Sequence, residues 1–254
     1  MFNDSGFSFT GETIAGLVRK QNEDSFLIAA PPERCTALAV VADGVGGHRH
    51  GEIVSYISCR DLGAAFKQTS DEELMEGDKA EKFLLQHITE INHRVYGINF
   101  EEFTLHPMSS TLVAVLFIPG FAVMANVGDS RFYAAGQDGA LKQISTDHTL
   151  ANETVYLEYK EKFGAKAANT ISRSIGARYN LRTEIKRIPV SEDERFLLCS
   201  DGVYRELSDE NLQTILFASN SSRQAVNRIM RHVLLKGAHD NSTVVAVFPG
   251  KETF

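Results

Sequence analysis

The sequence predicts an α+β fold in which antiparallel β-sheets pack together and helices cover their outer faces. Short apolar runs broken by turn residues are typical of strands, and the run that spans Thr111 to Val127 is interrupted at its middle by Pro119-Gly120. Longer segments have apolar residues at helical spacing. Strands and helices do not alternate regularly, which argues against a doubly wound parallel sheet.

The first half of the chain contains three strand-like runs, two helical segments and then a hairpin-like pair of strands. Residues Glu52 to about Lys67 have helical spacing, and a second helix carries the narrow stripe Leu84, Ile88, Ile91 and Val95. The expected strands are Glu12–Leu17, Ser25–Ala29, Ala37–Ala42, Thr111–Ile118 and Phe121–Asn126.

The second half is expected to begin with a strand at Arg131–Ala135 and to continue into a polar, partly helical excursion from about Asp147 to Asn169. A strand follows at Arg195–Cys199. One helix opens at Ser208, whose hydroxyl can cap free N–H groups, and another spans roughly Ser222–Lys236. Gly237 ends that helix, and Thr243–Phe248 forms the closing strand.

Composition is that of an ordinary globular domain, with 254 residues, 43% hydrophobic and 23% charged residues. No linker divides the chain, so we expect residues 1–254 to form one domain. The net charge of −7, with no block of Lys or Arg, argues against nucleic acid or an anionic membrane as partner.

The three cysteines and the N-terminal residues predict a cytoplasmic protein. Cys35, Cys59 and Cys199 are widely spaced among apolar residues, as expected of reduced core thiols. The first residues lack the basic start and apolar stretch of a signal peptide. The broken apolar run does not predict a membrane span. We expect a monomer.

Four aspartates lie at the ends of predicted strands: Asp43, Asp129, Asp201 and Asp240. Each of them taken alone is most simply a turn residue, because Asp-Gly and related steps are common in turns. If the strand ends meet at one rim of a sandwich, however, the carboxylates come together and repel each other unless they share cations. Oxygen ligands without a Cys/His set favour Mg²⁺ or Mn²⁺, and a pair of such ions suits attack on phosphorus.

The segment "RKQNEDS" places Arg19 shortly before Glu23 and Asp24, at the start of the second predicted strand. Arginine has a permanently charged, forked donor set that matches phosphate oxygens. An ordinary surface Arg–Glu pair is the commoner outcome of this spacing. The four aspartates favour the phosphate-binding interpretation.

An ordered set of motifs resembles the metal-dependent protein phosphatases, the type 2C serine/threonine family. These motifs are "RKQNEDS", "ADGVGGHRHGE", "SSTLVAVLF", "ANVGDSRFY", "DHTL", "SRSIG", "LLCSDGVYREL" and "HDNSTVVAV", from about Gly11 to Phe248. The chain is most similar to the stand-alone catalytic domains of bacterial members. The resemblance implies a four-layer α-β-β-α sandwich, two antiparallel sheets flanked by helix pairs.

The resemblance also implies roles for individual residues. Asp43 would bridge two Mn²⁺ or Mg²⁺ ions, with Glu23 and the Gly44 carbonyl on one ion and Asp201 and Asp240 on the other. Arg19 would bind the substrate phosphate, Asp24 would orient the metal ligands, and Asp129 would contribute to a weaker third metal site. The implied reaction is in-line attack of metal-bound hydroxide on phosphoserine or phosphothreonine, without a covalent phosphoenzyme. Its substrates would be proteins phosphorylated by a serine/threonine kinase.

Some positions depart from the family pattern. Val45 stands where the animal enzymes have a histidine, and His48 is the candidate proton donor instead, or else a histidine that shapes the loop. His50 has no family role, and an H-x-H zinc pair would lack a third ligand. Arg205 introduces a cation near the third metal position, so we expect a third ion to be weak or absent. Residues 147–170 occupy the position of the family's flap subdomain, with Asp147, His148 and Arg173 as anchors of its ends.

Three rival functions are less consistent with the sequence. In a dinucleotide-binding oxidoreductase, "GVGGHRHG" would need the spacing G-x-G-x-x-G, and the preceding Asp43 would repel pyrophosphate. A non-catalytic phosphoprotein-binding module would be expected to lack a metal ligand, yet all of the candidate ligands are present. A phosphodiesterase acting on nucleic acid would need a basic groove.

Overall fold

Two five-stranded antiparallel sheets form the centre of the computed structural model, which describes residues 6–45, 50–102, 107–136, 139–153, 157, 160–161, 164, 168–191 and 193–249. The first sheet has the order β2-β3-β4-β5-β8, with β2 Asp24–Ala29, β3 Ala37–Asp43, β4 Leu112–Ile118, β5 Phe121–Val127 and β8 Glu184–Pro189. The second has the order β1-β10-β9-β6-β7, with β1 Phe7–Ile14, β10 Ser242–Pro249, β9 Arg195–Cys199, β6 Arg131–Ala135 and β7 Leu141–Gln143.

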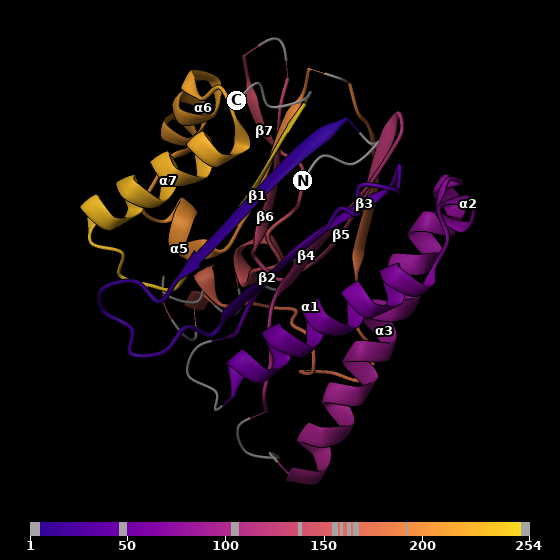
Figure 1. Ribbon diagram of the computed structural model, residues 1–254. Helices are drawn as coiled ribbons and strands as arrows, with labels where there is room; N and C mark the ends of the chain where they lie inside the picture. Colours follow the sequence, from indigo (N-terminus) through magenta and orange to yellow (C-terminus); the bar gives the residue numbers. More distant parts are fainter. Residues whose placement is uncertain are drawn as a thin grey trace.

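Helices cover the outer face of each sheet (Figure 1). The long helices α1 (Gly51–Gln68) and α3 (Gly77–Glu102) pack on the first sheet, and the short α2 (Asp71–Leu74) connects them. On the other side, α6 (Asp209–Ala218) and α7 (Ser222–Lys236) pack on the second sheet, together with the short α5 (Asp201–Tyr204). The predicted α+β fold, a four-layer sandwich with helix pairs outside antiparallel sheets, is confirmed.

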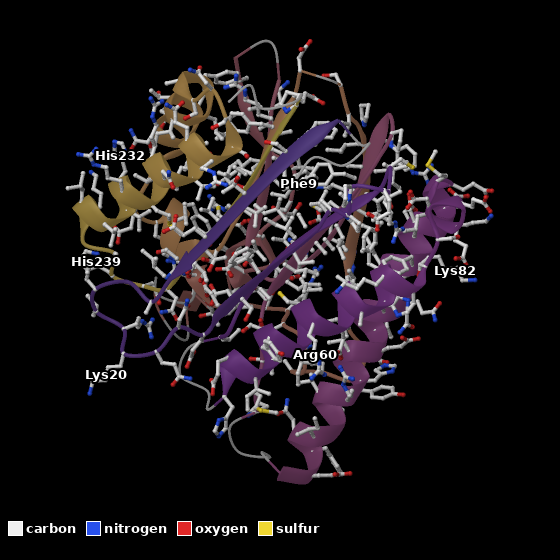
Figure 2. All side chains as sticks on the ribbon, in the orientation of Figure 1. Phe9, Lys20, Arg60, Lys82, His232 and His239 are labelled. Carbon is white, nitrogen blue, oxygen red and sulfur yellow. The ribbon has the colours of Figure 1, made fainter. Side chains whose placement is uncertain are left out.

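The inner faces of the two sheets share one hydrophobic core. Alternate residues along each strand point into it, so that Val41 of β3 and Val115 of β4 lie in the same cluster as Phe196 of β9 and Val245 of β10. Phe9 of β1, labelled in Figure 2, packs against this cluster edge-on to Phe117. Two further cores lie between each sheet and its helices.

The strand ends that carry acidic residues lie at one end of the sandwich. Asp24, the first residue of β2, pairs directly with Asp43, the last residue of β3. Asp201 follows β9, Asp129 lies between β5 and β6, and Asp240 precedes β10. Antiparallel pairing in both sheets therefore places all five carboxylates at the same end.

Most of the predicted elements are confirmed to within a few residues, and the first strand is the main error. It spans Phe7–Ile14 and not Glu12–Leu17, because Phe7 and Phe9 alternate toward the inter-sheet core while Gly16 turns the chain with φ +79°. The strands β7 and β8 were not predicted. Both are edge strands whose outer positions are exposed, so their apolar pattern is weak.

The region from Asp147 to Asn169 begins with a short 3₁₀ turn at Leu150–Asn152, and much of the rest lies outside the described residues. In the described part of the chain, we find no helix with the length and hydrophobicity needed to cross a bilayer.

Candidate active site

A pocket of about 390 Å³ opens at the acidic end of the sandwich. Its lining brings together six of the residues predicted from the sequence, which lie at or next to the ends of strands from both sheets: Arg19, Glu23, Asp43, Gly44, Asp201 and Asp240. Asp24 and Asp129 do not line the pocket and are almost fully buried beside it. His48, together with Gly46 and Gly47, lies outside the described residues.

Asp43 is fixed by its backbone at the end of β3. Its N–H donates to the Thr111 hydroxyl at 3.0 Å, and its carbonyl accepts bonds from the Thr111 N–H and the Ser110 hydroxyl, both at 2.8 Å. With its backbone held in this way, Asp43 lines the pocket.

Gly44 and Gly202, which follow Asp43 and Asp201, are required by close packing and not by turn geometry. A Cβ at Gly44 would lie 2.6 Å from the Gly51 carbonyl carbon and 2.8 Å from the Glu23 carbonyl oxygen, and one at Gly202 would collide with the Asn241 carbonyl oxygen. Neither glycine has a positive φ. The Asp-Gly steps are therefore places where backbones from different elements meet, and not simple turns.

Asp24 links the two sheets beneath the pocket. Its Oδ2 accepts hydrogen bonds from the hydroxyls of Ser200, at the end of β9, and Thr243, on β10, both at 2.7 Å. The Ser200 hydroxyl in turn accepts the Thr243 N–H at 2.9 Å. Oδ1 of Asp24 has no hydrogen-bond partner within the described structure.

Arg19 reaches the pocket from the loop between β1 and β2, where its guanidinium donates to Asp240 Oδ2 at 2.7 Å. Asn241 holds this loop in place. Its side-chain amide donates to the carbonyls of Ala15 and Gln21 and its Oδ1 accepts the Glu23 N–H, each at 2.9 Å.

The buried carboxyls at the site have elevated pKa values. Burial raises the pKa of Asp24 to about 6, in spite of the bonds from Thr243 and Ser200. Burial, together with the neighbouring Asp24 and Asp201, holds the pKa of Asp43 well above its usual range. Burial also raises the pKa of Asp201, and that of Glu23 with a smaller contribution from Glu52. If all of these carboxyls were ionised, their mutual repulsion would destabilise the site.

This donor set fits a divalent cation chemically. It consists of oxygen donors whose charges repel each other. Beside the pocket, the buried Oδ1 atoms of Asp24 and Asp129 have no hydrogen-bond partner in the described structure. The side chains are not gathered into a finished cage, however. Among the described residues, no group of three or more His, Cys, Asp or Glu side chains is arranged to hold an ion. Arg19 and Arg205 instead pair with Asp240 and Asp201.

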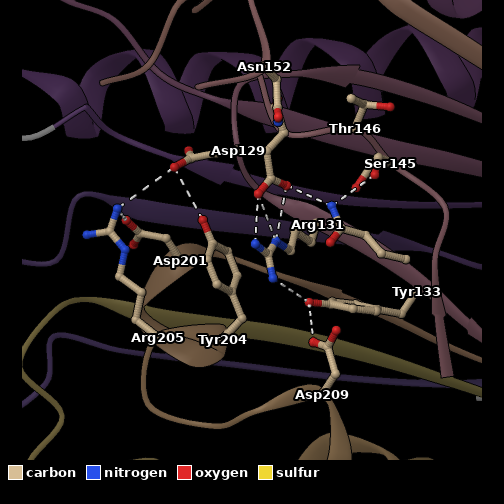
Figure 3. Close-up of polar contacts among 12 residues, drawn as sticks. Asp129, Arg131, Tyr133, Ser145, Thr146, Asn152, Asp201, Tyr204, Arg205 and Asp209 are labelled. Carbon is tan, nitrogen blue, oxygen red and sulfur yellow. Dashed lines mark hydrogen bonds and ion pairs between the residues drawn. The ribbon is translucent and has the colours of Figure 1, made fainter. Parts of the chain in front are cut away.

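A polar network extends from Asp201 through Arg205 to Asp129 (Figure 3). Arg205 of the α5 end lies 2.8 Å from Asp201 Oδ2 and 3.9 Å from Asp129 Oδ2, and the Tyr204 hydroxyl donates to Asp129 at 3.3 Å. Burial raises the pKa of Asp129 to about 6, with a further contribution from Asp201.

The same network reaches the start of the segment 147–170. The Arg131 guanidinium stacks on the Tyr204 ring at 3.6 Å from its centroid and donates to Asp147 Oδ2 at 2.7 Å. His148 accepts the Gly128 N–H at 3.1 Å, and burial lowers its pKa to about 4. At the other end of the segment, Arg173 donates to Glu153 at 3.0 Å.

Sequence reasoning missed several residues that build this site: Ser200, Thr243, Asn241, Tyr204 and Arg131. Their partners are distant in the sequence, so no local pattern indicates them. The one local signal is position, because Ser200 and Asn241 immediately adjoin Asp201 and Asp240.

The fold and the site together define a class: an antiparallel four-layer sandwich with a carboxylate-rich pocket and an arginine at one end. A family model described as "Protein phosphatase 2C" matches residues 18–237. The chain belongs to the protein phosphatase 2C family.

Individual relatives resemble the chain over nearly its whole length. It is 29% identical to the serine/threonine phosphatase stp of Listeria welshimeri, across 92% of this chain and 93% of that protein. The solved structure of the serine/threonine phosphatase Stp1 from Staphylococcus aureus superposes with a TM-score of 0.86 at 26% identity, covering 99% of this chain and 98% of that one. The catalytic domain of the serine/threonine phosphatase PstP, solved in complex with two manganese ions, gives a TM-score of 0.77 at 28% identity, covering 96% and 99%.

Proposed function

We propose that this chain is a metal-dependent phosphatase that hydrolyses phosphoserine and phosphothreonine in proteins by direct attack of water, with no covalent phosphoenzyme. The observation that carries the proposal is the meeting, in one pocket, of Arg19 with carboxylates from both sheets. Family membership and the named serine/threonine phosphatases among its relatives support the substrate class.

The residues assigned to the cations are those that line the pocket. Asp43 would contact two ions, Glu23 and the Gly44 carbonyl would complete the site of one, and Asp201 and Asp240 would hold the other. A pair of Mn²⁺ or Mg²⁺ ions, when bound, would supply an acidified water as nucleophile and polarise the phosphate oxygens. The complex of PstP with two manganese ions supports this number.

Arg19 would bind the phosphate of the substrate. Its side chain is half-exposed and its guanidinium is now held by Asp240, so a phosphate dianion entering the pocket competes with Asp240 for the same donors. Asp24 would keep Asp43 and Asp201 in place from below, through its bonds to Ser200 and Thr243. We assign to His48 the role of general acid, which donates a proton to the leaving alkoxide.

We propose that Arg205 weakens the binding of a third ion. Its guanidinium lies beside both Asp201 and Asp129, the two carboxylates that such an ion would use, so a cation there must displace or overcome a fixed positive charge. We expect calorimetric titration with Mn²⁺ to give two tight sites in the wild type and an additional site in Arg205→Ala. Three comparably tight sites in the wild type would contradict this assignment.

The proposal includes a physiological setting. The proposed substrates are cytoplasmic proteins phosphorylated by a serine/threonine kinase, and the protein would act as a monomer with one catalytic domain. The segment 147–170 would be its flap, joined to the site through Asp147, Arg131 and Tyr204.

The decisive experiment is hydrolysis of a phosphothreonine peptide with Mn²⁺, with and without a chelator, by the wild type and Asp201→Asn. Asp78→Asn is the matched control, because Asp78 is fully exposed on α3 and pairs only with Arg187 among the described residues. We expect chelation and Asp201→Asn each to abolish hydrolysis and Asp78→Asn to retain it. Activity that survives both chelation and Asp201→Asn, or a trapped phosphorylated enzyme, would refute the mechanism.

A further inference from the structure

A second pocket, of about 490 Å³, adjoins the active-site pocket. The two pockets share the wall formed by Thr170 and Ile171. Beyond that wall the second pocket is lined by three arginines, Arg173, Arg178 and Arg182, and by one acidic residue, Glu153.

One arginine of this second pocket forms an ion pair, and the other two do not within the described ranges. Arg173 donates to Glu153 at 3.0 Å. Arg178 and Arg182 are exposed, and within the described ranges no ion pair or side-chain hydrogen bond involves either of them. In a chain with a net charge of −7, two such arginines in one pocket form a local excess of positive charge.

The backbone that carries Arg178 is held firmly on α3. The side-chain amide of the buried Asn92 donates to the carbonyls of Arg178 and Tyr179 at 2.9 and 3.0 Å, and its oxygen accepts the Gly176 N–H at 2.8 Å. The Tyr179 ring stacks on His93 with centroids 4.2 Å apart.

The backbone around Arg182 is also held in place. The preceding Leu181 packs against the core between the first sheet and its helices, and β8 begins two residues after Arg182. The two guanidinium groups therefore extend from fixed positions on the edge of the pocket.

We propose that this pocket is a specificity subsite for an anionic side chain that flanks the target residue in the phosphoprotein substrate. The proposal rests on the proposed function, because it assumes that the phosphorylated residue occupies the neighbouring pocket. A substrate in extended conformation advances about 3.3 Å per residue, so a side chain a few positions away can cross the wall at Thr170 and Ile171.

The chemistry of the guanidinium group selects the ligand. Arginine pairs with planar carboxylates and with phosphates through two parallel N–H donors, whereas a basic flanking residue would be repelled. Aspartate, glutamate or a second phosphorylated residue would therefore be favoured over a neutral or basic residue at the flanking positions.

The test compares phosphothreonine peptides with neutral flanks, with aspartates before or after the target, and with a second phosphothreonine. The enzymes are the wild type, Arg178→Ala, Arg182→Ala, the double variant and the control Arg231→Ala, an exposed arginine on α7 against the other sheet. The readout is the ratio of kcat/KM for each anionic peptide to that for the neutral peptide, a ratio that cancels differences in the folded fraction.

We expect the wild type and Arg231→Ala to prefer an anionic flank on one side of the target by about twofold to thirtyfold at low salt, as two exposed charge pairs would give. The preference should arise mainly in KM, shrink with ionic strength, and disappear in the double variant. Equal ratios in the wild type and the double variant would overturn the subsite. If no peptide were hydrolysed by the wild type with Mn²⁺, the proposed function itself would fail.

Discussion

The half-buried carboxylate of Asp71 and the carboxylates of the active site differ in what surrounds them. Asp71, at the start of α2, receives hydrogen bonds from Arg34 and Thr36 at 2.6 Å and from the Cys35 N–H at 2.8 Å. The active-site group is the carboxylate cluster, which we define as Asp24, Asp43, Asp129 and Asp201.

The two groups differ in the direction of their pKa shifts. Although burial opposes it, bonds from Thr36, Cys35 and Arg34 lower the pKa of Asp71 to about 2. In the carboxylate cluster, burial and mutual repulsion raise the pKa values instead, to about 6 for Asp24 and Asp129. Asp71 is thus an element of stability, whereas the cluster is maintained at an electrostatic cost, as is typical of functional sites.

We expect the largest effect on activity from a substitution of Asp43 in the carboxylate cluster. Asp43→Asn should lower kcat/KM on a phosphothreonine peptide by at least about 100-fold, because metal ions contribute several kcal/mol of transition-state stabilisation. In the presence of a chelator, the same variant should unfold at a urea concentration no lower than the wild type, since it removes repulsion. A large loss of stability would show that Asp43 is structural, like Asp71.

The next largest effect is expected on stability, from a substitution of Asp71. Asp71→Asn should lower the free energy of unfolding by about 1–3 kcal/mol, because it weakens a charged hydrogen-bonding partner of Arg34. Urea denaturation measures this loss, and kcat/KM per folded molecule should be unchanged. In the wild type, the contribution of Asp71 should be lost as the pH falls from about 4 toward 2, since its pKa is lowered on folding.

The comparison also shows how far the sequence can predict such groups. Asp43 and Asp201 could be identified because each follows an apolar strand and precedes a glycine, and the strand order then brings them to one end. The bonds of Asp24 to Ser200 and Thr243 could not, because their partners are 176 and 219 residues away. The family resemblance placed Arg205 near the third metal position, but its ion pair with Asp201 at 2.8 Å, four residues away, was overlooked although the spacing is local. The subsite arginines Arg178 and Arg182 have no local signal.

The smallest effect concerns the sign of the pH dependence. Folding raises the pKa of Asp129 to about 6, so its contribution to stability is most favourable below the unfolded pKa of about 4 and is lost as the pH rises through 6. Without metal, Asp129→Asn should therefore be more stable than the wild type at pH 7, and this difference should vanish near pH 4.

The quantity to measure is the difference in unfolding free energy between the wild type and Asp129→Asn. His148 changes the stability in the opposite direction over the same pH range. Its pKa is lowered to about 4, so folding favours the neutral ring and stability falls as the pH drops from 6.5 toward 4 in both proteins. Subtracting the two urea titrations at each pH removes that shared contribution. If Asp129→Asn were less stable than the wild type at pH 7, the bond from Tyr204 and the nearby Arg205 would outweigh the repulsion, and Asp129 would belong with Asp71 and not with the carboxylate cluster.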